Sequence, residues 1–91
     1  MARVRFFGGA SDVAQGQKEM KVISKTLRET FEYLKEILGD QFTAFVFDET
    51  GSIRPFVNIF VNKKHVRQLQ GLDTKISDED EILIVPAIAG G

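Results

Sequence analysis

The sequence contains no cysteine. This absence excludes a disulfide framework, metal sites with thiolate ligands, and any mechanism that uses a cysteine nucleophile or a persulfide. The sequence also has no surplus of positive charge, because 12 Lys and Arg residues stand against 13 Asp and Glu residues, a formal net charge of −1 at pH 7. Nucleic acids and anionic membranes bind proteins with a basic surplus, so we expect neither as a partner.

Long apolar runs are absent as well. A membrane-spanning helix needs about 20 consecutive apolar residues, and the apolar runs of this chain are far shorter. Residues 1–5 lack the apolar stretch of a signal peptide. A chain of 91 residues is long enough for one domain with a modest core and too short for two. We therefore expect a small, soluble, cytoplasmic domain.

The first part of the chain predicts two strands followed by a helix. Residues 3–8 alternate between charged and apolar side chains, which is typical of a half-buried strand. Residues 10–16 are small and polar, as in a loop or a short helical turn, and residues 17–24 are interpreted as a second strand in a hairpin with the first. The helix is indicated by apolar residues at helical spacing, namely Leu27, Phe31, Leu34 and Leu38.

Both ends of this helix carry sequence signals. Thr26 followed by Glu29 fits a capping box, in which each side chain satisfies a free backbone amide at the helix start. Gly39 stands where a C-terminal cap needs a residue in the left-handed region.

The second half of the chain predicts strands. Residues 42–47 are interpreted as a strand, residues 48–51 as a turn, and residues 53–61 as a further strand. Residues 63–77 form a polar connection, and the continuously apolar residues 82–85 predict a central strand buried on at least one face. We place this last strand beside the first one, and Pro86 ends it.

This order of elements indicates an α+β protein with a mixed sheet of four to five strands and one main helix packed on one face. We divide the chain into a folded domain over residues 1–85 and a flexible C-terminal tail over residues 86–91. The tail is built from small residues, Pro86-Ala87-Ile88-Ala89-Gly90-Gly91. A terminal pair of glycines alone is more typical of a frayed end, but here a tail of small residues that ends in the pair leaves a buried strand directly.

The chain resembles the MoaD/ThiS sulfur-carrier family of ubiquitin-like β-grasp proteins. The resemblance spans nearly the whole chain, from the opening strand and the helix entry to the tail. Its most specific part is the final third, where the matching residues are Asn62, Leu72, Thr74, Asp78, Asp80, Pro86 and Gly90-Gly91. Within the family the chain looks most like the small subunit of molybdopterin synthase.

This resemblance implies a β-grasp fold and a sulfur carrier in molybdopterin biosynthesis. The carboxylate of Gly91 would be adenylated by a ubiquitin-activating-like adenylyltransferase and then converted to a thiocarboxylate. The sulfur acceptor would be bound by the molybdopterin synthase large subunit or by another acceptor protein. The chain would bind no cofactor or metal itself, since the activating partner uses the ATP. It would be the carrier subunit of a sulfurtransferase, without catalytic side chains of its own.

The tail composition suits this chemistry. A C-terminal carboxylate is ionised at pH 7, since its pKa is about 3.3–3.7, and it can attack a phosphate. Gly90 and Gly91 lack a Cβ and can pass through a narrow channel in a partner. Ala87 and Ala89 keep the tail slim, and Ile88 offers one apolar anchor.

The predicted sheet also offers a surface for partners. If Val57, Ile59 and Val61 face the helix, then Phe56 and Phe60 face solvent, where clustered aromatic side chains mark partner sites. The alternative is that both phenylalanines pack under the connection of residues 63–77. The resemblance favours a partner site, with a polar rim made of Arg3, Arg5 and Arg54.

Two other functions remain open from the sequence. The chain could be a ubiquitin-like modifier that is joined through Gly91 to lysines of target proteins, because the same activated terminus serves both fates. It could also be a β-grasp interaction domain that is never activated.

Overall fold

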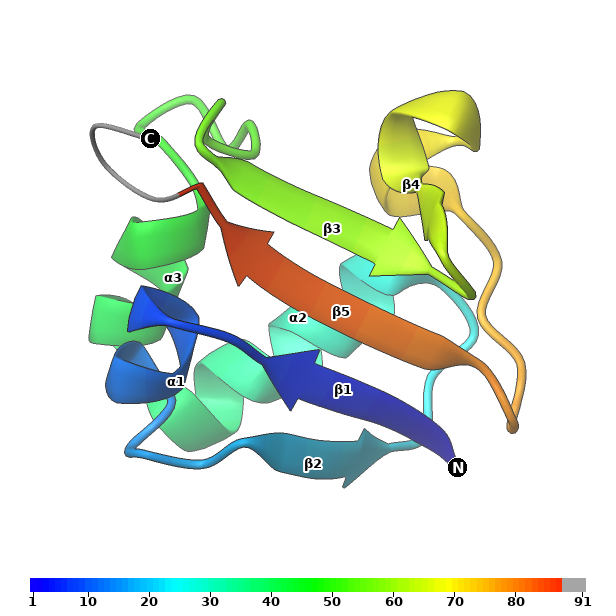
Figure 1. Cartoon of the computed structure of the whole chain (residues 1–91), viewed down its shortest axis with the longest axis horizontal. Helices are drawn as coiled ribbons and strands as arrows, with labels where there is room; N and C mark the ends of the chain where they lie inside the picture. Colours follow the sequence, from blue (N-terminus) through cyan, green and yellow to red (C-terminus); the bar gives the residue numbers. More distant parts are fainter. Residues whose placement is uncertain (88–91) are drawn as a thin grey trace.

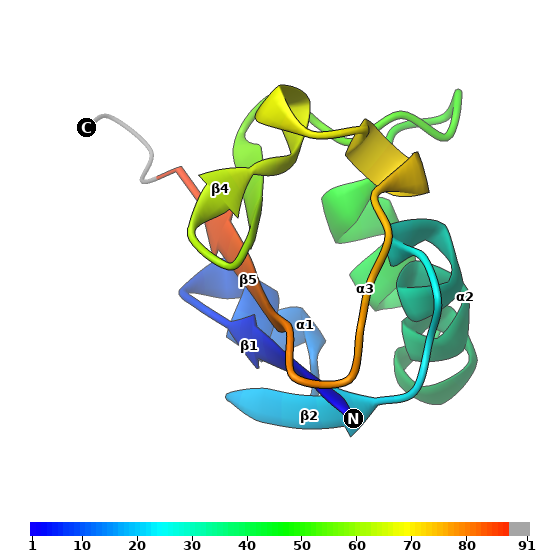
Figure 2. The same cartoon turned by 90° about the vertical axis from the view of Figure 1, so that its right-hand side faces the viewer.

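The structure, a computed structural model, describes residues 1–87. It forms two layers, with a sheet on one side and helices on the other (Figures 1 and 2). The strands are β1 (Ala2–Phe6), β2 (Glu19–Val22), β3 (Val57–Val61), β4 (Lys64–His65) and β5 (Glu81–Pro86). The helices are α1 (Gly9–Val13), α2 (Leu27–Leu38) and α3 (Asp40–Val46), with two 3-10 turns, η1 (Val66–Gln68) and η2 (Gly71–Asp73).

The sheet has the strand order β2-β1-β5-β3-β4. Strand β5 pairs in parallel with β1 and antiparallel with β3, so the last strand lies in the centre beside the first one, as the sequence predicts (Figure 1). β1 and β2 form the predicted hairpin. Because β1 and β5 are parallel, both strands end at the same edge of the sheet, where the chain leaves β5.

The core lies between the sheet and the helix layer. The sheet contributes alternate residues, including Val4, Phe6, Ile59, Ile82 and Ile84, and α2 contributes the predicted stripe of Leu27, Phe31, Leu34 and Leu38. Phe42 of α3 joins the two layers, because its ring lies 5.9 Å from that of Phe6 and 6.2 Å from that of Phe31. Burying side chains of this size stabilises the fold by about 1.5–3 kcal/mol each.

The predicted strand over residues 42–47 is wrong, because this segment is helix α3. Phe42 and Val46 lie one helical turn apart and are both buried, so the helix presents one apolar edge to the core. A short apolar run does not by itself distinguish a buried helix from a strand. Gly39 has a φ of 85° and turns the chain sharply between α2 and α3.

The strand expected over residues 53–61 is shorter than predicted. Strand β3 begins at Val57, and residues 47 and 53 form only an isolated bridge. Because residues 40–46 form α3, the helix layer contains this helix in addition to the one main helix that the sequence predicts. The connection of residues 63–77 contains β4 and both 3-10 turns, and β4 supplies the fifth strand. In the segment predicted as a loop or a short helical turn, residues 10–16, the first four residues belong to α1 and the last three form a turn.

The turn that follows α3 is held by one carboxylate. Asp48 accepts hydrogen bonds from the Thr50 hydroxyl at 2.6 Å, the Thr50 amide at 2.9 Å and the Ser52 amide at 3.1 Å. The Thr50 hydroxyl and the Ser52 amide hold the pKa of this carboxyl below its ordinary value. This arrangement confirms the turn predicted over residues 48–51.

The start of α2 confirms the predicted cap with one difference. The Thr26 hydroxyl accepts from the Glu29 amide at 3.1 Å, while the Glu29 carboxylate accepts from the amide of Lys25, one residue earlier than in a capping box. The Leu27 amide donates to the Thr74 carbonyl at 2.9 Å, which ties the start of α2 to the end of η2.

Replacing the helix cap tests this account of α2. We expect Thr26→Ala to lower the free energy of unfolding by about 1 kcal/mol, because the Glu29 amide loses its acceptor. The melting temperature should fall by about 4–8 °C. Thr26→Ser is the matched control, since it keeps the hydroxyl. Equal losses in the two variants, measured by urea and thermal unfolding, would contradict the role of the hydroxyl.

Candidate functional site

The chain leaves the sheet at the end of β5. Pro86 is the last residue of the strand and lies opposite Val57 of β3. The Ala87 amide donates to the Phe56 carbonyl at 2.6 Å, which extends the pairing of the two strands past Pro86. The predicted tail residues Ile88, Ala89, Gly90 and Gly91 lie outside the described residues.

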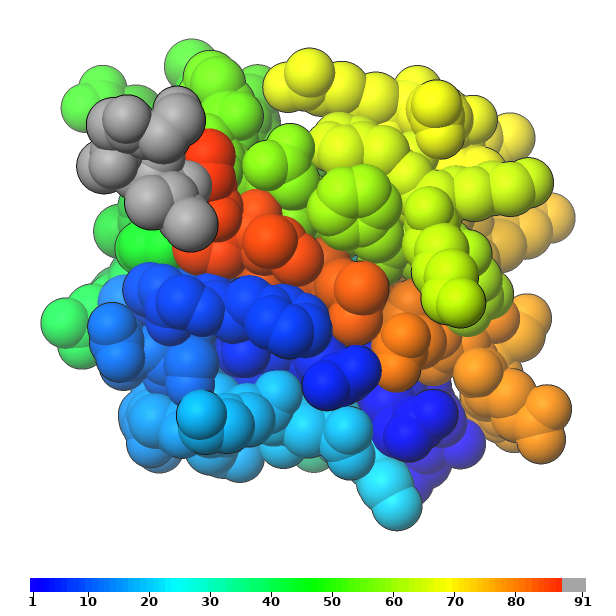
Figure 3. Space-filling model, viewed as in Figure 1, coloured from blue at the N-terminus to red at the C-terminus, as the bar shows by residue number. Residues whose placement is uncertain are grey.

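Beside this exit lies the open face of the sheet, the face that points away from α2 and α3 (Figures 2 and 3). Its centre is an apolar strip made of Phe60, Leu83 and Val85, all half-buried. Phe60 lies directly opposite Leu83, and Asn58 lies opposite Val85, so the strip crosses β3 and β5 toward the exit. A half-buried apolar strip of this kind is a surface that a partner can cover.

Charged and polar groups flank the strip on both sides. On β1, Arg5 lies 3.6 Å from the Glu81 carboxylate, and its guanidinium carbon lies 5.3 Å from the centre of the Phe7 ring. Exposed ion pairs of this type contribute only about 0–1 kcal/mol to folding, so these side chains remain free to exchange partners.

The other flank of the strip is made by β4. His65 packs edge-on against Phe60 with ring centroids 5.2 Å apart. Its Nδ1 accepts from the Arg67 amide at 3.1 Å, so in the neutral imidazole Nε2 carries the proton and donates to Asn58 Oδ1 at 3.2 Å. These bonds fix the ring that borders the apolar strip.

The structure brings together some of the predicted surface residues and separates others. Arg3, Arg5 and Phe60 share the open face. Phe56 lies at the exit, 42% exposed, with its ring edge-on to a ring of α3. Arg54 lies against the end of α3, because its Nε donates to the Ala44 carbonyl at 2.9 Å and its amide donates to the Val46 carbonyl at 2.8 Å.

Leu83 and Val85 are functional candidates that the sequence reasoning did not single out. Ile82 and Ile84 are fully buried against the helices, so their neighbours must point to the opposite face. The signal was present in the sequence, because a continuously apolar strand places apolar side chains on both faces. Only one of those faces is covered within the described residues.

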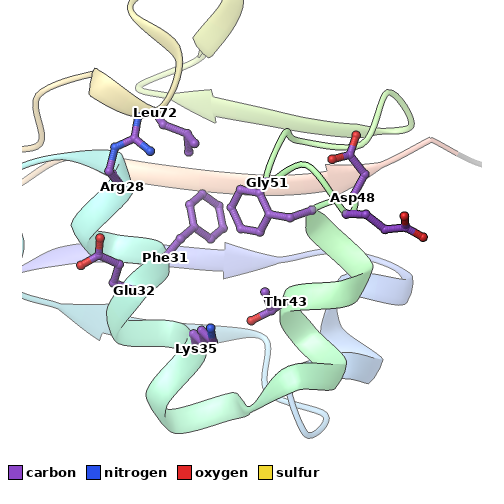
Figure 4. A pocket seen from close by; sticks show the side chains of 10 residues that line it. Arg28, Phe31, Glu32, Lys35, Thr43, Asp48, Gly51 and Leu72 are labelled. Atoms are coloured by element: carbon purple, nitrogen blue, oxygen red, sulfur yellow. The ribbon is translucent and has the colours of Figure 1, made fainter.

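A hollow of about 330 Å³ lies on the helix side of the molecule (Figure 4). It is lined by the rings of Phe31 and Phe47, whose centroids are 5.1 Å apart, and by the charged side chains of Arg28 and Asp48, among others. Among the predicted site residues that fall within residues 1–87, none lines this hollow. Within residues 1–87, no three acidic or histidine side chains are grouped so that they could hold a metal ion, and no helix is long and apolar enough to cross a membrane.

The sequence model of the ThiS family matches residues 4–91. The chain therefore belongs to the ThiS family of ubiquitin-like sulfur carriers, and its two-layer structure is the β-grasp fold. This result confirms the resemblance to the MoaD/ThiS family as a whole.

Individual relatives agree with this assignment. The chain is 33% identical over 84 residues to the sulfur carrier protein CysO of Mycobacterium tuberculosis, covering 92% of this chain and 84% of the relative. The crystal structure of that CysO superimposes with a TM-score of 0.85 at 28% identity, over 97% of this chain and all of the other. CysO in the BexX/CysO complex of Amycolatopsis orientalis gives a TM-score of 0.85 at 25% identity over the whole of both chains. Small archaeal modifier protein 3 of Haloferax volcanii is 37% identical over 43 residues, 47% of each chain.

Truncating two adjacent side chains of β5, one on each face, tests whether the open face contributes to the stability of the fold. We expect Ile84→Ala to lower the free energy of unfolding by about 2–5 kcal/mol, because it leaves a cavity in the core. Leu83→Ala should cost less than about 1 kcal/mol, because its half-buried side chain lies on the open face of the sheet, outside the core between the sheet and the helices. Urea unfolding of both variants measures the difference. Similar losses would show that the strip is part of the folding core.

Proposed function

We propose that this protein carries sulfur as a thiocarboxylate on Gly91. The observation that carries the proposal is the position of β5, which runs through the centre of the sheet and ends beside an open apolar strip. The chain continues from that point as Ala87-Ile88-Ala89-Gly90-Gly91. A partner that covers the strip can thus receive the tail in the same binding event.

The chemistry uses the terminal carboxylate as a nucleophile. One of its oxygens attacks the α-phosphorus of ATP, pyrophosphate leaves, and Gly91 becomes an acyl adenylate. A hydrosulfide then attacks the carbonyl carbon, and AMP leaves with the electron pair of the broken C–O bond. The product is the thiocarboxylate. The thiocarboxylate sulfur attacks an electrophilic carbon of the acceptor and displaces a leaving group there, which gives a thioester between Gly91 and the acceptor. Water then attacks the carbonyl carbon of Gly91, the C–S bond breaks, the sulfur stays on the acceptor as a thiolate, and the carboxylate is restored.

The partners supply the catalytic groups in this proposal. A ubiquitin-activating-like adenylyltransferase binds the ATP, and this chain supplies the docking face and a slim terminus. The BexX/CysO complex supports this division, since a similar carrier forms a complex with a second protein there. Glycine at positions 90 and 91 lets the backbone approach the nucleotide closely.

For the acceptor we propose the large subunit of molybdopterin synthase. The support is the resemblance of the chain, within its family, to the small subunit of that enzyme, while Leu72, Thr74 and Pro86 match motifs of the family as a whole. The experiment is sulfur transfer from the charged carrier to the large subunit loaded with its pterin precursor. Charged carrier that keeps its sulfur in this assay would exclude this acceptor and leave the carrier chemistry intact.

A second function, protein modification, is favoured by one comparison. Part of the chain is similar to small archaeal modifier protein 3, at 37% identity over 43 residues. The acyl adenylate on Gly91 could react with a lysine amine in place of a hydrosulfide, which forms an amide bond and releases AMP. Ladders of conjugates of higher mass on blots of a tagged chain would support it, and their absence under all growth conditions would count against it.

Deleting Gly91 tests the reactive end. We expect this variant to keep the wild-type melting temperature, because the residue follows the folded domain, and to lose sulfur transfer completely. The measurement is the mass of the C-terminal peptide after incubation with the activating enzyme, ATP and a sulfide source. The full-length chain, incubated in parallel, is the control, since it keeps Gly91. Retained sulfur loading on the shortened chain would refute the proposal.

A charge placed in the apolar strip tests the docking face. We expect Leu83→Glu to reduce ATP–pyrophosphate exchange at low carrier concentration by about tenfold, the loss that a central interface residue commonly causes. Ile37→Glu is the matched control, because Ile37 is an exposed apolar residue of α2 on the helix side, 41% exposed. It should change the rate by less than about twofold. Equal effects of the two variants would place the docking surface elsewhere.

A further inference from the structure

We infer that the residues around the end of β5 form an exit clamp, which fixes the direction in which the tail leaves the sheet. The exit clamp consists of Gly8, Phe45, Phe56 and Pro86, together with the amide of Ala87. Its members are positioning residues for the reaction at Gly91, so the inference rests on the proposed function. None of them needs to touch the nucleotide.

The first part of the exit clamp is a backbone hydrogen bond. Pro86 has no amide proton, so the ladder between β3 and β5 cannot continue through its nitrogen. The Ala87 amide is the next donor along the chain, and it bonds to the Phe56 carbonyl at 2.6 Å. This bond is the last tie between the tail and the sheet within the described residues.

The second part is a pair of aromatic rings that holds Phe56 in place. The ring of Phe56 lies edge-on to the ring of Phe45, with centroids 5.7 Å apart and an interplanar angle of 82°. Phe45 belongs to α3 and is itself held against the start of α1, because a Cβ on Gly9 would lie 3.2 Å from its ring. The helix layer thereby fixes the residue whose carbonyl binds the tail.

The third part is the loop after β1, on the other flank of Pro86. The Phe7 amide donates to the Ile84 carbonyl at 3.1 Å, which continues the parallel pairing of β1 and β5. Gly8 has a φ of 54° and a ψ of −133°, a combination that residues with a Cβ avoid. A Cβ there would lie 3.5 Å from the Pro86 ring, so the loop passes directly against the proline.

The consequence concerns the reach of the terminus. Four peptide units separate Ala87 from Gly91, which span at most about 14 Å when extended. With Ala87 tied to the sheet, the carboxylate of Gly91 can enter a partner only within that distance of the exit. Without the clamp, the activating enzyme must order additional residues before the carboxylate reaches the nucleotide, which weakens productive binding.

Removing the Ala87 amide tests the clamp directly. Ala87→Pro deletes the donor, and the residue before it lies in a strand, a conformation that a following proline accepts. Ala87→Ser keeps the donor and is the control. We expect Ala87→Pro to raise the KM for the carrier in ATP–pyrophosphate exchange about fivefold, the size of one net protein hydrogen bond, with kcat unchanged.

A second pair of variants tests the aromatic part. Phe45→Ala should raise the same KM and speed the hydrogen exchange of the Ala87 amide, while Phe47→Ala should change neither. Phe47 is the matched control because it lies one residue past α3 and packs against Phe31, away from the exit. Circular dichroism at the assay temperature verifies that each variant is folded.

The outcomes separate this inference from the proposed function. If wild-type protein supports ATP–pyrophosphate exchange and Ala87→Pro has the KM of Ala87→Ser, the exit clamp is refuted and the proposed function stands. If the wild-type chain itself supports no exchange with an activating enzyme that charges another carrier, the proposed function fails and the positioning role fails with it. The clamp is supported if the KM rises for Ala87→Pro and Phe45→Ala and keeps the wild-type value for the controls Ala87→Ser and Phe47→Ala.

Discussion

The parallel pairing of β1 with β5 is the interaction on which the rest of the structure depends. It joins the two ends of the chain at the centre of the sheet, with Val4 and Ile82 opposite each other and fully buried. Contacts between residues so far apart in sequence close a long loop, so they must be stabilised by extensive burial. The helix layer supplies this burial. The same pairing sends the chain out of the sheet beside the loop that follows β1.

The last strand has two faces with different roles. Ile82 and Ile84 point into the core and stabilise the fold, whereas Leu83 and Val85 point away from the helices. This division lets a carrier present an apolar surface and a reactive tail without weakening its own core. It also explains how a chain without cysteine takes part in sulfur chemistry, since the sulfur would be held by the terminal carbonyl carbon.

The sequence predicted much of the fold and only part of the site. Helix α2 is predictable because its cap residues and its apolar stripe indicate the same bounds for the helix. The central place of β5 follows from its continuous apolar run. Helix α3 is not predictable from local propensity, because aromatic residues such as Phe42 favour strands, while burial between the two layers decides the structure of this segment. The bond between Ala87 and Phe56 was not predictable, since it joins residues that only the completed sheet brings together.

The intact mass of the protein shows whether Gly91 carries sulfur. The mass should be measured on protein isolated from its native cells, and again after incubation with its activating enzyme, ATP and a sulfur source. The account predicts a gain equal to the replacement of one oxygen by one sulfur, located on the C-terminal peptide. An unchanged mass under conditions that charge a known carrier would contradict it and would favour a β-grasp interaction domain that is never activated.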